Sequence, residues 1–275
     1  MRISLGRRRQ NREMSAPNRV LLLSERPFLM AEWRFLAMLQ YEVEPDVLRP
    51  LVPRGTELDQ WQGRTLVSVV GFRFLNTRVL GAPIPFHRHF DEVNLRFYVR
   101  RRGPEGWRRA VVFVREIVPR RAIAVVARIW YNEPYISLPM RHSVAIDGAE
   151  QGAPGRIRYE WLHHGRWARL EVESQGIPTR PPPGTEAEFI AEHYWGYTAQ
   201  RDGGLLEYQV AHLPWRVWAV GRASLNCDAG RLYGSPFAYF LSGSPYSAFL
   251  AEGSAVAVHR GRRIPNESLL ARVAP

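Results

Sequence analysis

Hydrophobic and polar residues alternate most regularly over residues 92–101 (EVNLRFYVRR). A period of two predicts a β-strand with one apolar and one polar face. The apolar face holds Val93, Leu95, Phe97 and Val99, and the polar face holds Glu92, Asn94, Arg96 and Tyr98. A second apolar run over residues 109–118 follows the turn sequence Gly103-Pro104-Glu105-Gly106. The two runs together predict an antiparallel hairpin.

The rest of the chain repeats this strand-rich pattern. Strands are predicted over residues 64–74, 156–162, 167–173, 205–210 and 255–260, with a hairpin turn at His164-Gly165 and a loop over 75–90. Helices are predicted over 121–131, from the capping box at 185–188 to about Trp195, and over 228–233. Residues 48–53 form a short helix or turn, and residues 27–43 mix helical and strand signals. The pattern indicates a β-rich α+β fold with short helices.

Composition and charge limit the class of protein. The chain has 275 residues, of which 45% are hydrophobic, and no apolar run approaches the ~18 residues of a membrane-spanning helix. Residues 1–19 hold six Arg and one Glu and are expected to form a disordered basic lead. That lead supplies five of the twelve net positive charges. Cys227 is the only cysteine, which excludes an internal disulfide and fits a cytoplasmic location.

All 38 basic residues are arginine, and the chain contains no lysine. This absence excludes a Schiff base on a side-chain amine, a lysine-anchored pyridoxal phosphate and a P-loop lysine. No cofactor is expected from any motif in the chain.

The polar face at residues 92–98 is the first candidate site. An acid, an amide, a guanidinium and a phenol on one face suit the lining of a pocket for a carboxylate or carbonyl compound, with Arg96 as an anion clamp. The alternative is a solvated sheet face with cross-strand charge pairs, which the sequence alone favours.

Three other patterns carry weaker signals. His87, His89 and Glu92 give an H-x-H-x-x-E cluster, but three ligand types within six residues are common by chance, so no metal site is assigned. Arginine clusters at 100–102, 108–109 and 120–121 raise nucleic acid as a partner, yet no nucleic-acid motif accompanies them. His193 beside Glu192 invites an acid–base interpretation, although adjacent helical residues do not face each other.

Longer segments resemble a known family. AEWRFLAMLQYEVEPDVLRPLVPRGTELD, VSVVGFRFLNTRVLGAPIPFHRHFDEVNLRFYVRR, EHYWGY and LEYQVAHLPWRVW are similar to the YqjF-like family of uncharacterised bacterial proteins. That family in turn resembles the acetoacetate decarboxylase-like superfamily. The resemblance implies a cone-like pseudo-barrel in one domain, expected over residues 20–264 with a tail at 265–275, and a ligand site inside it.

The same resemblance places the superfamily's site on particular residues. The segment that carries the Schiff-base lysine aligns with residues 127–136, where Arg128 and Pro134 match but the two lysine positions hold Tyr135 and Ile136. Glu92 matches an acid of the site. Two further positions fall on Glu42 and Gly71, where an Arg and a Glu are expected. The resemblance therefore supports the fold and opposes the lysine mechanism.

The sequence thus predicts binding, or conversion without a Schiff base, of a small organic acid or carbonyl metabolite. Glu92 would be a general acid or base, Arg128 would orient an anionic group, and Tyr135 would donate a hydrogen bond in place of the amine. Asn94, Arg96, Tyr98 and His87 are the expected ligand-binding residues. No nucleic acid or membrane partner is expected, and an oligomer of identical chains stays open. The alternatives are a non-catalytic binding or assembly protein and a metal enzyme that uses His87, His89 and Glu92.

Overall fold

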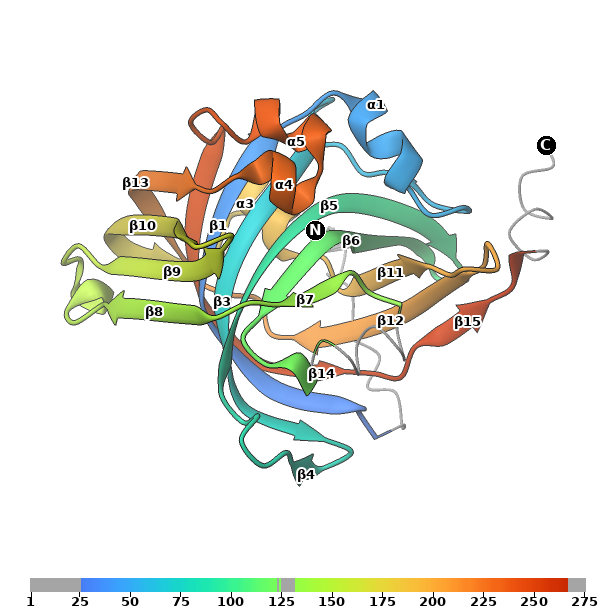
Figure 1. Ribbon diagram of the computed structural model, residues 1–275, viewed down its shortest axis with the longest axis horizontal. Coiled ribbons are helices and arrows are strands. Elements are labelled where there is room, and N and C mark those ends of the chain that lie inside the picture. Colours follow the sequence, from blue (N-terminus) through green and yellow to red (C-terminus); the bar gives the residue numbers. More distant parts are fainter. Residues whose placement is uncertain (1–25, 123, 125–131, 267–275) are drawn as a thin grey trace, which may run out of the picture.

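The computed structural model describes residues 26–122, 124 and 132–266 (Figure 1). The expected lead at 1–19 lies outside these residues, as do most of the tail at 265–275 and most of the helix predicted over 121–131.

Strands dominate the described part of the chain. They are β1 (Leu29–Glu42), β2 (Glu57–Leu58), β3 (Leu66–Val79), β4 (Ala82–Pro83), β5 (Phe90–Gly103), β6 (Gly106–Val118), β7 (Tyr135–Ser137), β8 (Met140–Ala145), β9 (Arg156–His163), β10 (Arg166–Thr179), β11 (Trp195–Ala199), β12 (Leu205–His212), β13 (Val217–Asn226), β14 (Ser247–Val258) and β15 (Arg262–Ile264). The helices are short: α1 (Pro45–Leu48), η1 (Arg49–Leu51), η2 (Ala149–Gln151), α3 (Glu186–Ala191), α4 (Ala229–Tyr233) and α5 (Ser235–Phe240). The predicted β-rich α+β class is confirmed.

Seven strands close into a ring. The sheet runs β12-β11-β6-β5-β3-β1-β14, and β14 pairs again with β12. Neighbouring strands in the ring are antiparallel except for β11 and β6, which are parallel. Closure removes the sheet edges at these strands and encloses an interior, as in other barrels.

The sheet continues beyond the ring through β13, β10, β9 and β8, which lie to the left in Figure 1. The main hydrophobic core fills the space between this extension and the outer face of the ring, where Leu39, Val69 and Leu95 pack with Tyr159 and Trp161. Gly71 permits close contact there, because a Cβ at this position would lie 2.6 Å from Cδ2 of Tyr159.

Several predicted elements are confirmed. The hairpin of β5 and β6 turns between Gly103 and Gly106, and β9 and β10 turn at His164-Gly165. Thr185 caps α3 by accepting a hydrogen bond from the Glu188 backbone nitrogen, at 3.4 Å.

Other boundaries were wrong. Helix α3 ends at Ala191, and Trp195 opens β11 instead of closing a helix. The loop predicted over 75–90 is shorter, because β3 continues to Val79 and β4 follows. Residues 27–43 are mostly strand β1, and the strand predicted over 255–260 begins earlier, at Ser247.

A β-bulge in β6 decides which side chains enter the ring. From the turn, residues pair regularly as far as Arg96 with Phe113, but Leu95 then pairs with Arg115 and leaves Val114 unpaired. A one-residue shift exchanges the two faces of a strand. Glu116 therefore comes opposite Asn94, on the inner face of the ring, where Arg115 would otherwise lie.

Candidate functional site

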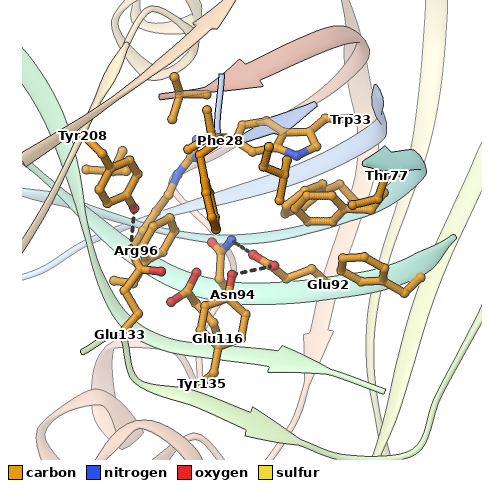
Figure 2. Close-up of a pocket in the computed structure, with 18 of the residues that line it drawn as sticks. Phe28, Trp33, Thr77, Glu92, Asn94, Arg96, Glu116, Glu133, Tyr135 and Tyr208 are labelled. Carbon is orange, nitrogen blue, oxygen red and sulfur yellow. Dashed lines mark hydrogen bonds between the residues drawn. The ribbon is translucent and has the colours of Figure 1, made fainter. Parts of the chain in front are cut away.

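The interior of the ring contains a cavity of about 420 Å³ (Figure 2). Every strand of the ring contributes to its lining, from Trp33 on β1 to Tyr208 on β12 and Val258 on β14. Tyr135 on β7 joins them from beside β6, with which β7 pairs in parallel. The volume falls in the range of small-molecule sites, roughly 300–1,000 Å³.

Most of the wall is apolar and aromatic. Phe74 stacks on Phe90 with ring centroids 4.4 Å apart, and Trp33 contacts Phe72 and Phe74 edge-on at 5.3 and 5.8 Å. These rings lie at the end of the cavity where β5 begins. An apolar group of a ligand would be desolvated there.

Three carboxyl side chains converge in the middle of this cavity. Glu92 accepts hydrogen bonds from Asn94 Nδ2 at 2.9 Å and from the Tyr135 hydroxyl at 3.1 Å. Glu133 accepts a hydrogen bond from Tyr208, and Glu116 Oε2 is buried without a hydrogen-bond partner. Figure 2 shows the three acids facing one another around Asn94 and Tyr135. Glu92 and Glu116 are only 2% and 1% exposed.

Burial governs the protonation of this carboxyl cluster (Glu92, Glu116 and Glu133). Loss of solvation raises the pKa of Glu92 to about 7, against the lowering effect of the bonds from Asn94 and Tyr135. Burial likewise raises the pKa of Glu133 to about 7. The pKa of Glu116 is raised well above its ordinary value, first by burial and then by the charges of the other two acids. Near neutral pH the cluster therefore holds protons that it can donate and exchange.

This protonation predicts an unusual stability profile for Glu116→Gln. A carboxyl group with a raised pKa binds more protons in the folded than in the unfolded protein, so the free energy of unfolding falls as pH rises from about 4.5 toward the folded pKa. Glu116→Gln has no carboxyl group at this position and therefore lacks this fall in the free energy of unfolding. Its stability relative to the natural protein should therefore increase between pH 5 and pH 8 by at least ~1 kcal/mol, since each pKa unit corresponds to about 1.4 kcal/mol.

Urea unfolding at the two pH values measures this difference. Glu105→Gln is the matched control, because its hydrogen bond with Arg108 lowers the pKa of this exposed acid. The control should give the same stability difference at pH 5 and pH 8. An equally constant difference for Glu116→Gln would contradict the raised pKa.

Arg96 and His193 lie at the opposite end from the aromatic rings. Arg96 is 8% exposed and its Nε is buried without a hydrogen-bond partner, and no carboxylate among the described residues lies within 4.0 Å of its guanidinium. Both ring nitrogens of His193 also lack hydrogen bonds, although Nε2 is 3.5 Å from Asp59 Oδ2. Burial lowers the pKa of His193 to about 4, so its imidazole is neutral. A buried guanidinium without a counter-ion is costly, and an anionic ligand group would relieve that cost.

The cavity brings together most of the residues that the sequence singled out. Glu92, Asn94, Arg96 and Tyr135 line it, and the favoured interpretation of the 92–98 face as solvated was wrong because ring closure buries that face. His87 lines it while its Nδ1 donates to the Pro85 carbonyl at 2.7 Å.

Two expected residues, Tyr98 and Arg128, are not among the described residues that line the cavity. Tyr98 does not line the cavity, because its hydroxyl is 2.5 Å from Ser68 Oγ and its ring packs between Phe189 and His193. Arg128 lies outside the described residues.

The alternative sites are not assembled. The described residues contain no group of three His, Cys, Asp or Glu side chains placed to hold a metal, and His89 is exposed and accepts from the Asn76 backbone while Glu92 is buried. Four of the seven arginines in these clusters pair with acids instead of forming a free basic stripe. The pairs are Arg100–Glu57, Arg101–Glu207, Arg108–Glu105 and Arg109–Asp59. No helix in the part of the chain that the structure describes has the length and apolar character of a membrane span.

Sequence reasoning missed Glu116, Glu133 and Tyr208. Glu116 follows a bulge that the sequence pattern does not predict. Glu133 stands two residues before Tyr135, whose backbone N–H donates a hydrogen bond of 2.9 Å to the Glu133 carbonyl. The two further site positions that the family resemblance placed on Glu42 and Gly71 do not line the cavity. Glu42 is exposed and pairs with Arg64, and Gly71 faces Tyr159 on the outer side of the ring, whereas Phe72 faces the cavity.

Comparison with solved structures identifies the fold. The enduracididine biosynthesis enzyme MppR with HEPES buffer bound aligns with a TM-score of 0.62 at 15% identity, over 87% of this chain and 89% of that chain. MppR complexed with pyruvate gives a TM-score of 0.62 at 16% identity, over 90% and 93%. Acetoacetate decarboxylase from Legionella pneumophila gives 0.59 at 16% identity, over 92% of each chain. The fold is therefore acetoacetate decarboxylase-like, as the resemblance implied.

Sequence comparison identifies the family. The protein YqjF of Bacillus subtilis is 25% identical over 207 residues, which are 75% of this chain and 79% of YqjF. The model of the family DUF2071, described as an uncharacterized conserved protein, matches residues 30–255. This match spans nearly the whole ring, and the chain therefore belongs to the DUF2071 family.

Proposed function

We propose that this protein binds a small organic acid that carries a carbonyl group and moves protons at the carbon beside that carbonyl. One observation supports the proposal above the others, the convergence of Glu92, Glu116 and Glu133 with Tyr135 inside a mostly apolar cavity. A buried carboxyl group whose pKa lies near neutrality is suited to general acid–base catalysis.

The environments of the acids support two different roles. Glu92 receives two hydrogen bonds, which favour its carboxylate form, so Glu92 is the base. Glu116 has an unpartnered oxygen and the greater tendency to stay protonated, so Glu116 is the acid. Glu92 removes a proton from the carbon, the C–H electron pair forms a C=C bond, and the carbonyl oxygen receives the Glu116 proton. The product is the enol, and the reverse sequence restores the ketone with both acids in their starting forms.

Arg96 would bind the carboxylate of the ligand. Arg96 is four positions after Glu92, which corresponds to roughly 13 Å between their backbones along β5 at ~3.3 Å per residue. A carboxylate at Arg96 would leave an adjacent carbonyl near Asn94 and the carboxyl cluster, and an apolar substituent among Phe72, Phe74 and Phe90. Arg128, expected from the sequence to orient an anionic group, would be a second contact.

The similarity to MppR supports the same ligand class, because that protein has been observed with pyruvate, an oxo acid. The chemistry here must differ from a Schiff-base mechanism, since the chain has no lysine and Tyr135 stands at the expected amine position. Tyr135 would donate its single hydroxyl proton to the Glu92 carboxylate and hold that group in place.

Exchange of the methylene protons of phenylpyruvate in D₂O tests the proposal. ¹H NMR near neutral pH should show exchange that is faster with the protein than with buffer or with heat-unfolded protein, and proportional to protein concentration. Calorimetry should show one binding site. Binding without accelerated exchange would overturn the catalytic part and favour the alternative of a non-catalytic binding protein. Absence of binding across 2-oxo and 3-oxo acids would overturn the proposal as a whole.

A further inference from the structure

Two polar atoms at the aromatic end of the cavity have no partner. Trp33 Nε1 and Thr77 Oγ1 are both buried without a hydrogen bond, and both residues line the cavity. Thr77 is only 2% exposed. Buried donors are nearly always satisfied, so two unpaired ones against the same cavity indicate that a ligand atom completes them.

These two groups lie beyond the carboxyl cluster, on the side away from Arg96. Phe72 pairs with Glu92 and Phe74 pairs with Phe90, and Thr77 lies three residues further along β3. Trp33 pairs with Phe74 across β1 and β3. Figure 2 shows Trp33 and Thr77 on one side of the cavity, and Glu133 and Tyr208 on the other.

The cavity therefore has a repeated polar–apolar order along its length. Along β5, Arg96 comes at one end, and Asn94 and Glu92 of the carboxyl cluster follow. The rings of Phe72, Phe74 and Phe90 come next, with Trp33 edge-on against Phe72 and Phe74, and Thr77 lies three residues further along β3. A ligand with a purely apolar tail would leave those two groups desolvated and unpaired, which weakens its binding.

We propose that Trp33 and Thr77 form a distal polar subsite, and that the ligand is an aryl oxo acid with a hydrogen-bond acceptor on the ring at the end remote from its carboxylate. This inference rests on the proposed function and adds the substrate class. The indole N–H only donates, so the distal ligand atom must accept a hydrogen bond. A phenol oxygen fits both residues, because it accepts from Trp33 Nε1 while its own proton is donated to Thr77 Oγ1.

The affinities of 4-hydroxyphenylpyruvate and phenylpyruvate, measured by calorimetry, test this inference. The natural protein should bind the hydroxylated compound at least ~10-fold more tightly, because only that compound satisfies the buried groups. Trp33→Phe removes the donor and keeps a ring against Phe72 and Phe74, and Thr77→Val removes the hydroxyl at nearly constant volume. Either variant should reduce the preference to within about threefold, mainly by weakening 4-hydroxyphenylpyruvate binding.

Trp107→Phe is the matched control, since this exposed tryptophan packs under Arg100 and lies outside the cavity lining. It should keep the full preference. Equal affinity of the natural protein for the two compounds, or an unchanged preference in both cavity variants, would overturn the distal subsite and leave the proposed function standing. Failure of both compounds to bind would contradict the proposed function and this inference with it.

Discussion

Glu92→Gln is expected to slow the protein-promoted exchange of phenylpyruvate protons by about 100-fold or more, the usual contribution of a positioned general base. The amide has the size of the carboxyl group but cannot take up the proton from carbon. Glu92 is 2% exposed and is held by hydrogen bonds from Asn94 and Tyr135. In the variant the amide fills this buried position, so no water molecule acts as the base there. Phenylpyruvate affinity should change little, because Arg96 and the aromatic wall supply the binding.

The rate of exchange by ¹H NMR and the affinity by calorimetry separate these two effects. Glu105→Gln is again the matched control, since this acid lies in the exposed β5–β6 turn and should leave both quantities unchanged. An exchange rate in Glu92→Gln above half that of the natural protein, with native affinity, would remove Glu92 as the base.

Arg96→Met is expected to weaken phenylpyruvate binding by about 100-fold, because a desolvated guanidinium–carboxylate contact contributes about 2–5 kcal/mol. The same variant should not lose stability when it is empty. The Arg96 guanidinium is buried and its Nε has no partner, and replacing an uncompensated buried charge by an apolar chain of similar length is neutral or stabilising. Loss of affinity together with equal or greater stability distinguishes a ligand anchor from a structural ion pair.

Arg100→Met is the matched control on the same strand. Its guanidinium is exposed and pairs with Glu57 at 2.6 Å, outside the cavity, so its phenylpyruvate affinity should equal that of the natural protein. Native affinity in Arg96→Met would show that the ligand carboxylate binds elsewhere.

The sequence predicted the candidate site where local pattern alone determines it. The alternation over 92–98 placed Glu92, Asn94 and Arg96 on one strand face, and those three side chains line the cavity. It did not predict their burial, because burial depends on pairing between β12 and β14, whose residues are more than forty positions apart in the chain. Such long-range closure leaves no periodic signal in either segment.

The parts of the site that hydrophobic periodicity did not predict have similar physical explanations. The bulge at Val114 brings Glu116 inward, and a regular hairpin register would instead have placed Arg115 opposite Asn94. Tyr135 reaches the cluster through parallel pairing of β7 with β6, in a strand of only three residues. Its place was expected from the family resemblance, whereas neither bulges nor such short strands can be read from hydrophobic periodicity.

A crystal structure with 4-hydroxyphenylpyruvate would show whether the ligand lies against the carboxyl cluster. We expect its carboxylate within hydrogen-bond distance of Arg96, its carbonyl oxygen beside Glu116 and Tyr135, and the adjacent carbon facing Glu92. The phenol oxygen should lie at Trp33 and Thr77. A ligand bound outside the ring, or held in the cavity with its carbonyl remote from Glu92, Glu116 and Tyr135, would contradict the proposed function.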